Sequence, residues 1–188
     1  MEKELRDIVS NNNVALAAYY VVSNGGDITE FYKEQLKLIE DDTYSDMACK
    51  KGCFQCCYRK VKVMDSEKSN VLKAFNRLPS VDDVRKRALI RVELNSNYLP
   101  CPLLNLKNGS CLIYEDRPLS CRTMTSYSLK SCIKFLPNYA KVPSNHDLNF
   151  LRKDIHAGCT LFEVEKGKRI SKVDSTIDEV ILDDKVQE

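Results

Sequence analysis

The sequence predicts a mainly α-helical single domain that carries a small β-hairpin and cysteine-rich metal-binding loops. Apolar residues recur three and four positions apart over most of the chain, which is the spacing of amphipathic helices. An Asn108-Gly109 pair between apolar residues is typical of a tight hairpin turn. Eight of the nine cysteines fall in two stretches, the third observation behind this prediction.

The N-terminal part of the chain is predicted to be helical. Residues 3–22 have an apolar face, and the polar run Asn11–Asn13 could divide this helix in two. Asp27 begins the next helix, with Glu30 three residues later as in a capping box. The N-terminal helices are therefore expected to cover residues 3–42.

Beyond the first cysteine stretch we expect one short strand and three more helices. Residues 59–64 alternate between polar and apolar side chains as a strand does. The helices begin at Asp65 or Ser66, at Ser80 and near residue 146, the last of them reaching about residue 165. The chain then alternates weakly and ends acidic, so residues 173–188 are expected to form an acidic tail after a single domain of residues 1–172.

A row of basic side chains lies on the helix that Ser80 opens: Arg85, Lys86, Arg87 and Arg91. Such a row could bind phosphate or an acidic partner. More often it is a solvated helix face, and we expect that role here.

Composition limits the classes of function. The formal net charge of +2 gives no reason to expect nucleic-acid binding. No apolar run is long enough for a membrane span, and the charged N-terminus lacks an export signal. We therefore expect a cytoplasmic protein, where clustered cysteines indicate metal or redox chemistry. The odd number of cysteines also argues against a complete set of intramolecular disulfides.

The first cysteine stretch has the spacing C-x3-C-x2-C-C. Its members are Cys49, Cys53, Cys56 and Cys57. In a helix all four thiols would fall within an arc of about 100°. Gly52 favours instead a loop that leads into a helix near Cys53. Either way, the C-x2-C pair can reach one ion, while the adjacent Cys56 and Cys57 need not share a metal.

The second cysteine stretch spaces its thiols more widely, at Cys101, Cys111, Cys121 and Cys132. A strict two-residue hairpin at Asn108-Gly109 would pair Leu106 with Cys111 and would leave Cys101 nearer to Cys121 than to Cys111. Together the two stretches supply eight candidate ligands, enough for two four-thiol sites or for one site with spare thiols. Lys and Arg near these thiols could offset the negative charge of a thiolate centre; they are Lys50, Lys51, Arg59, Lys60, Arg117 and Arg122.

Other residues of ligand or pocket type lie nearby. His156 and Cys159 have ligand-like spacing on a predicted helix, yet we expect surface or core roles for them and for His146. Tyr114, Arg117 and Tyr127 flank the metal region and could either line a pocket or pack.

The cysteine pattern resembles the CxxCxxCC family, which is described as a zinc- or iron-chelating domain and has flagellin lysine-N-methylase among its relatives. The likeness lies in Gly52-Cys53-x2-Cys56-Cys57 and in Cys111-x-Ile113-Tyr114-x2-Arg117-Pro118-x2-Cys121-Arg122, and it covers about residues 45–135. It implies ligands from both stretches: Cys49, Cys53, Cys56, Cys57, Cys101, Cys111 and Cys121, with Cys132 as an eighth.

Three functions stay open at this point. The first is a metal-binding protein that holds zinc or an iron–sulfur cluster such as [4Fe-4S], because all-thiolate ligation suits both. The second is a metal-dependent enzyme: the Cys49-x3-Cys53-x2-Cys56 spacing is that of radical S-adenosylmethionine enzymes, and the family likeness suggests a protein-modifying methylase. The third is an adaptor whose loops are stapled by metal. A protein partner or substrate fits the last two, and the oligomeric state is not readable.

Overall fold

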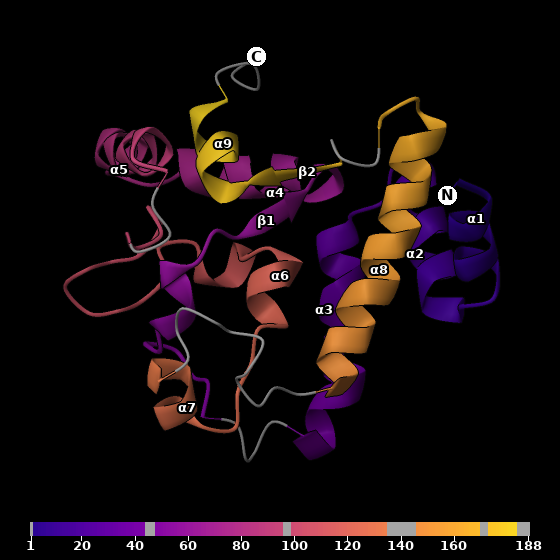
Figure 1. Ribbon diagram of the computed structural model, residues 1–188, viewed down its shortest axis with the longest axis horizontal. Helices are drawn as coiled ribbons and strands as arrows, with labels where there is room; N and C mark the ends of the chain where they lie inside the picture. Colours follow the sequence, from indigo (N-terminus) through magenta and orange to yellow (C-terminus); the bar gives the residue numbers. More distant parts are fainter. Residues whose placement is uncertain (1, 44–47, 96–98, 135–145, 170–172, 184–188) are drawn as a thin grey trace.

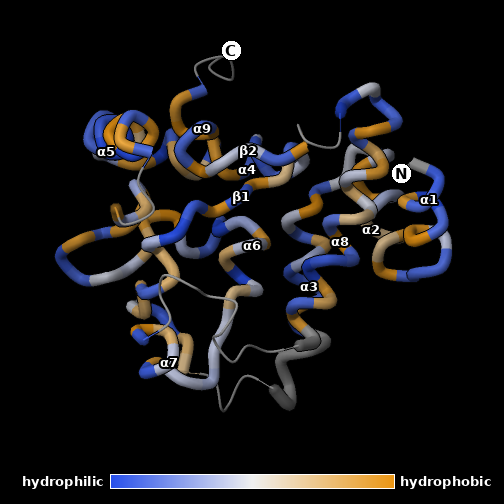
Figure 2. Tube along the Cα trace, viewed as in Figure 1, coloured by the Kyte–Doolittle hydropathy of each residue, from blue (hydrophilic) through white to orange (hydrophobic). Residues whose placement is uncertain are grey.

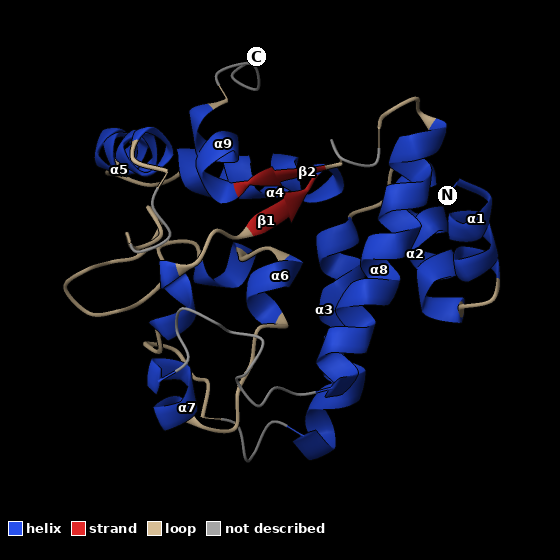
Figure 3. Ribbon diagram, viewed as in Figure 1, coloured by secondary structure: helices blue, strands red, loops and turns tan. Residues whose placement is uncertain are grey.

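The computed structural model describes residues 2–43, 48–95, 99–134, 146–169 and 173–183 (Figure 1). Over these residues the protein is mainly helical with one small antiparallel sheet, as predicted (Figure 3). The longer helices are α1 (Glu2–Ser10), α2 (Asn13–Ser23), α3 (Ile28–Thr43), α4 (Asp65–Asn76), α5 (Val81–Glu93) and α8 (His146–Glu165). The shorter elements are η1 (Gln55–Tyr58), β1 (Lys62–Met64), η2 (Tyr114–Asp116), α6 (Leu119–Arg122), α7 (Leu129–Lys134), β2 (Asp174–Thr176) and α9 (Ile177–Leu182).

The N-terminal helices pack with α8 into one half of the molecule. The predicted break in residues 3–22 is confirmed, because Asn12 caps α2 by accepting a hydrogen bond from the Ala15 N–H at 2.9 Å. Helix α8 lies along α2 and α3 (Figure 1). Gly158 sits where α8 meets α2, since a Cβ there would lie 2.1 Å from the Ala15 carbonyl oxygen. The buried side chains between α2, α3 and α8 form a core of their own.

The other half is built around β1, β2, α4, α5 and α9. Strand β1 pairs antiparallel with β2, with Lys62 opposite Thr176 and Met64 opposite Asp174. The prediction of an acidic tail over residues 173–188 is therefore wrong for residues 173–183. Ile177, Val180 and Ile181 of α9 are at most 2% exposed and pack against α4 and α5. Residues 184–188 lie outside the described residues.

The basic side chains of helix α5 are not all exposed to solvent. Arg91 is 1% exposed, and its guanidinium lies 3.4 Å from the Asp178 carboxylate of α9. Arg91 also donates to the Arg59 carbonyl at 3.1 Å. Burial raises the pKa of Asp178 even though Arg91 opposes that shift. The expectation of a solvated role is wrong for Arg91, because its partner comes from a helix that the pattern did not predict.

The turn at Asn108-Gly109 forms, but not in the predicted register. Cys111 bridges to Leu104 rather than to Leu106. The Asn105 N–H donates to the Ser110 carbonyl at 2.8 Å, and the Leu112 N–H donates to the Leu103 carbonyl at 2.8 Å. The loop is wider than a two-residue turn because Asn105 and Asn108 bond to backbone N–H groups within it.

The distribution of hydropathy follows this division. Apolar segments of α8 and α2, coloured orange in Figure 2, contribute to one core, and those of β1 and α9 contribute to the other. No helix in the described ranges is both long enough and apolar enough to cross a bilayer.

Candidate metal centre

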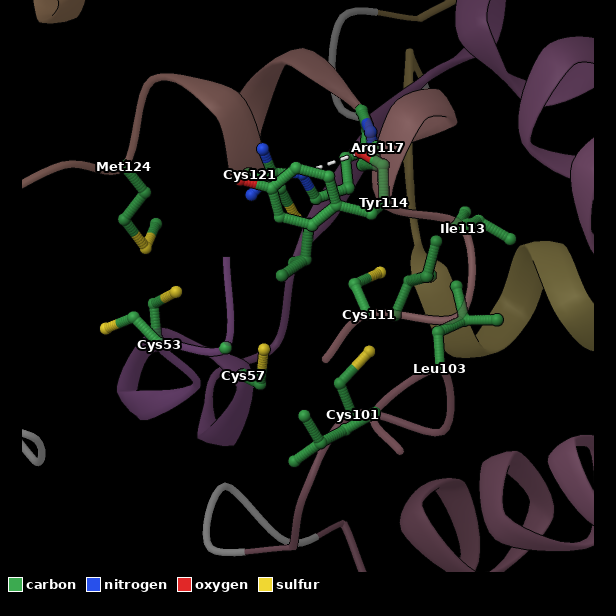
Figure 4. A pocket seen from close by; sticks show the side chains of 16 residues that line it. Cys53, Cys57, Cys101, Leu103, Cys111, Ile113, Tyr114, Arg117, Cys121 and Met124 are labelled. Carbon is green, nitrogen blue, oxygen red and sulfur yellow. Dashed lines mark hydrogen bonds between the residues drawn. The ribbon is translucent and has the colours of Figure 1, made fainter. Parts of the chain in front are cut away.

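Seven of the eight predicted ligand thiols line two adjoining cavities. The first cavity, of about 50 Å³, is lined by Cys53, Cys56, Cys57, Cys101, Cys111 and Cys121. The second, of about 350 Å³, is lined by Cys49, Cys53, Cys56 and Cys121. Figure 4 shows thiols of both stretches around the first cavity, with Cys53 and Cys57 on one side and Cys101 and Cys111 on the other. Early and late cysteines therefore line the same cavities.

A turn at Gly52 places the first stretch. Gly52 has a φ of +92°, a left-handed conformation that favours glycine. The Cys53 N–H donates to the Lys50 carbonyl at 2.9 Å and closes this turn. The short 3₁₀ helix η1 follows and carries Cys56 and Cys57. The loop ending at Gly52 is as expected, while the element after it is a single 3₁₀ turn.

Backbone contacts hold the second stretch against the first. The Cys101 N–H donates to the Cys57 carbonyl at 2.6 Å. At the wide turn, Gly109 has a φ of +72°, and a Cβ there would lie 2.7 Å from the Phe54 ring. The bridge between Leu104 and Cys111 then turns Cys111 back toward the cavity.

A buried carboxylate positions Cys121. Pro118 precedes α6, and the Leu119 N–H in the first turn donates to Glu67 at 2.6 Å. The other carboxylate oxygen of Glu67 accepts the Met64 N–H at 3.2 Å. Glu67 is 1% exposed, and burial raises its pKa to about 7 despite these two hydrogen bonds. Sequence reasoning missed Glu67, because nothing in its neighbourhood along the chain marks it as buried.

Cys49 is held from the other side of the site. Its sulfur accepts a hydrogen bond from the Ser126 N–H at 3.1 Å. The Ala48 N–H donates in turn to the Ser126 carbonyl at 2.9 Å. Backbone N–H groups that donate to sulfur stabilise a thiolate, as they do around metal-bound cysteines.

The thiols of the first stretch form two hydrogen-bonded pairs. The bond from Cys49 lowers the pKa of Cys53 to about 6 and raises that of Cys49. The bond from Cys57 likewise lowers the pKa of Cys56 and raises that of Cys57. In each pair, therefore, one thiol loses its proton more easily than the other.

Burial is the largest influence on the pKa values of the thiols in the second stretch. It raises the pKa of Cys101 to about 12, and it raises the pKa values of Cys111 and Cys121 as well. The Arg117 guanidinium opposes this shift at Cys111 and Cys121. Its carbon lies 3.8 Å from the centre of the Tyr114 ring, a stacked arrangement visible in Figure 4.

Cys132, Cys159 and His156 lie apart from the two cavities. Cys132 is buried on α7, and Cys159 is buried on α8. His156 bonds to the Asp174 carboxylate at 3.0 Å, in keeping with a surface role. Tyr114 and Arg117 line both cavities, whereas Tyr127 lines neither. Met124 also lines both cavities, and no sequence signal marked it.

The cavity thiols suit a soft metal both by their chemical type and by their number. All nine cysteines are free thiols. Thiolates favour zinc and iron–sulfur centres, and the cavities bring together more than the four ligands that one such centre takes. Within the described ranges, no three Cys, His, Asp or Glu side chains lie close enough to hold one ion as they stand. Metal binding would therefore draw these thiols closer together.

The comparison with known families agrees with this site. A family model named CxxCxxCC, described as "Putative zinc- or iron-chelating domain", matches residues 48–168. No curated protein and no solved structure matches the chain. The matched residues make up more than half of the chain and contain all seven cavity thiols. The chain therefore belongs to the CxxCxxCC family, whose description as a chelator of zinc or iron supports metal binding by this protein.

Proposed function

We propose that the seven cavity thiols hold a polynuclear metal centre, either two zinc ions or an iron–sulfur cluster. One observation carries this proposal: thiols from stretches far apart in the sequence line two adjoining cavities. Cys53, Cys56 and Cys121 line both cavities, so they are placed to serve neighbouring metal positions. An isolated structural zinc ion would use only four of the seven.

The metal would tie together segments that have little regular structure of their own. The ligands come from the Gly52 turn with η1, from the wide turn around Gly109, and from α6, a helix of four residues. Such short elements gain stability from a shared metal, as small metal-binding domains generally do. An iron–sulfur cluster would add the capacity to transfer an electron. A reducing cytoplasm, which keeps thiols free, is the compartment that we propose for such a protein.

Metal analysis of protein purified without oxygen tests the proposal. We expect two or more zinc or iron atoms per chain by elemental mass spectrometry. Iron with equivalent acid-labile sulfide and a visible charge-transfer band would identify a cluster, and a colourless sample would identify zinc. A ratio of one metal atom per chain would overturn the polynuclear centre, and a metal-free folded protein would overturn the site altogether.

Cysteine variants locate the centre. We expect Cys56→Ser and Cys121→Ser each to lose most of the metal, because both thiols line both cavities. Cys159→Ser is the matched control, since this thiol is 1% exposed but lies on α8, outside the cavities. Cys132→Ser tests the eighth predicted ligand separately. Equal metal loss in Cys159→Ser would show that the effect follows from folding and not from ligation.

A further inference from the structure

We propose that the second cavity binds a small oxyanion, a carboxylate or phosphate group, beside the metal centre. The inference deepens the proposed function, because four thiols of that centre line this cavity. A cavity of about 350 Å³ is within the range of small-molecule sites. Its lining differs from that of the first cavity in carrying several cations.

Three cationic side chains line the cavity, and one acidic side chain opposes them. The cations are Lys50, Arg117 and Arg122, and the acid is Glu115. Apart from the thiols, the lining therefore carries more cationic than anionic side chains. Cations in a concave site attract anions and strengthen their hydrogen bonds, so these side chains favour a ligand with negative charge.

Arg117 is held ready for such a ligand. Its Nε donates to the Tyr114 carbonyl at 3.0 Å, and its plane stacks on the Tyr114 ring. Its main-chain carbonyl accepts bonds from the Tyr32 hydroxyl at 2.8 Å and from Arg122 at 2.9 Å. The terminal amino groups of Arg117 make no hydrogen bond to the described residues. A fixed guanidinium with free terminal donors is suited to bind two oxygens of a carboxylate or phosphate.

Thr125 supplies an independent observation. It lines the same cavity and is 4% exposed, and its hydroxyl finds no hydrogen-bond partner among the residues that the structure describes. A buried hydroxyl without a partner is costly, and such groups often mark a site where a ligand completes the bond. The hydroxyl and Arg117 would then both bond to the anion.

A simpler role for these cations is to balance the charge of the thiolates. Arg117 does act on the thiols, because it lowers the pKa of Cys56. Charge balance gives no role to the uncharged hydroxyl of Thr125, nor does it distinguish Lys50 from its neighbour Lys51. Variants at these positions therefore separate the two explanations.

The test is calorimetric titration of metal-loaded protein with inorganic phosphate and, separately, with malonate. We expect saturable binding of at least one probe at one site per chain, and the probe that binds identifies the chemical class. Thr125→Val and Lys50→Gln should each weaken that binding about tenfold, the loss of one hydrogen bond to a charged group. Arg117→Lys should weaken it at least as much, because the forked donor is lost.

Two matched controls accompany these variants. Thr123→Val removes a buried hydroxyl that bonds to the Leu119 carbonyl and lines neither cavity. Lys51→Gln removes a charge adjacent to Lys50 that also lies outside both linings. Both should leave the affinity unchanged. Absence of saturable binding, or equal weakening by the controls, would overturn the oxyanion site. Metal content measured on the same samples reports separately on the metal centre.

Discussion

Glu67 shows how one side chain can set the geometry of a site that it does not line. Its two oxygens accept N–H groups from the end of β1 and from the first turn of α6. These bonds fix the start of the segment that carries Cys121. A fully buried carboxylate is unfavourable when charged, so its protonation state couples folding to pH.

Replacing Glu67 with Gln should remove a pH dependence from stability. The folded-state pKa of about 7 lies above the unfolded value, so the folded protein binds the proton more tightly. The stabilising effect is complete below pH of about 4.3 and is lost as the pH rises through 7, a change of about 4 kcal/mol in the free energy of unfolding. Glu67→Gln should lack this decline in denaturant unfolding measured from pH 5 to 8.

The control for this prediction is Glu93→Gln, which alters an exposed carboxylate at the end of α5. It should keep the wild-type pH profile. The amide at position 67 accepts only one of the two N–H groups well, so the variant should also be less stable than wild type at pH 5. A difference between Glu67→Gln and wild type that stays constant with pH would contradict the assignment.

At the scale of elements, two close approaches of backbone determine how the pieces meet. Helix α8 approaches α2 so closely that only glycine fits at position 158, with Ala15 and Ala18 opposite. The wide turn approaches the Gly52 loop so closely that only glycine fits at position 109. In both places the absence of a side chain on glycine allows two elements to pack closely.

Gly158→Ala should destabilise the protein, although alanine is the better helix former. In an open helix this change would stabilise by about 1 kcal/mol. Here the methyl group would overlap the Ala15 carbonyl, and overpacking of this kind costs about 1–3 kcal/mol. Chemical denaturation measures the sign. Lys153→Ala, at an exposed position of α8, is the control and should change the free energy of unfolding little.

Gly109→Ala should cost more stability than Gly25→Ala. Both glycines have a φ of +72°, so the backbone penalty of about 1 kcal/mol is the same for each. A Cβ at position 25 meets open space, whereas one at position 109 meets Phe54 and the Gly52 carbonyl. We therefore expect about 1–3 kcal/mol of additional destabilisation at position 109.

The same pair of glycines links packing to the metal. The wide turn packs the second cysteine stretch against the first. Gly109→Ala should therefore also lower the metal content, while Gly25→Ala should not. Denaturant unfolding and elemental analysis of both variants provide the comparison. Equal losses at the two positions would show that the turn does not hold the stretches together.

At the scale of the whole molecule, the cysteine segments pack against one core and contact a second core through Leu119 of α6. Val61, Leu103 and Ile113 belong to the core with α4, α5 and α9. Met64 and Leu119, on either side of Glu67, belong to the core with α2, α3 and α8. The C-terminal strand and helix complete the first core, and Ile177 of α9 also lines the first cavity.

Ending the chain at residue 172 should therefore abolish cooperative folding and metal binding. The truncation removes the partner of β1 and four buried aliphatic side chains, whose burial contributes about 6–12 kcal/mol. That is comparable to the whole stability of an ordinary domain. Thermal unfolding followed by circular dichroism tests this. A chain ending at Asp183 retains β2 and α9 and should unfold cooperatively, and a stable, metal-loaded chain ending at residue 172 would contradict the prediction.

The sequence by itself determined the helical class, the break at Asn11–Asn13 and the family. The class and the break depend on periodicity and caps, which lie within a few residues of one another, and the family depends on the spacing of a motif. The tertiary structure alone decided that β1 pairs with β2, that Arg91 is buried against Asp178, and that Thr125 lines a cationic cavity. Each of these depends on a partner distant in the chain, and a side chain's burial is set by what packs on it rather than by its own neighbours in sequence.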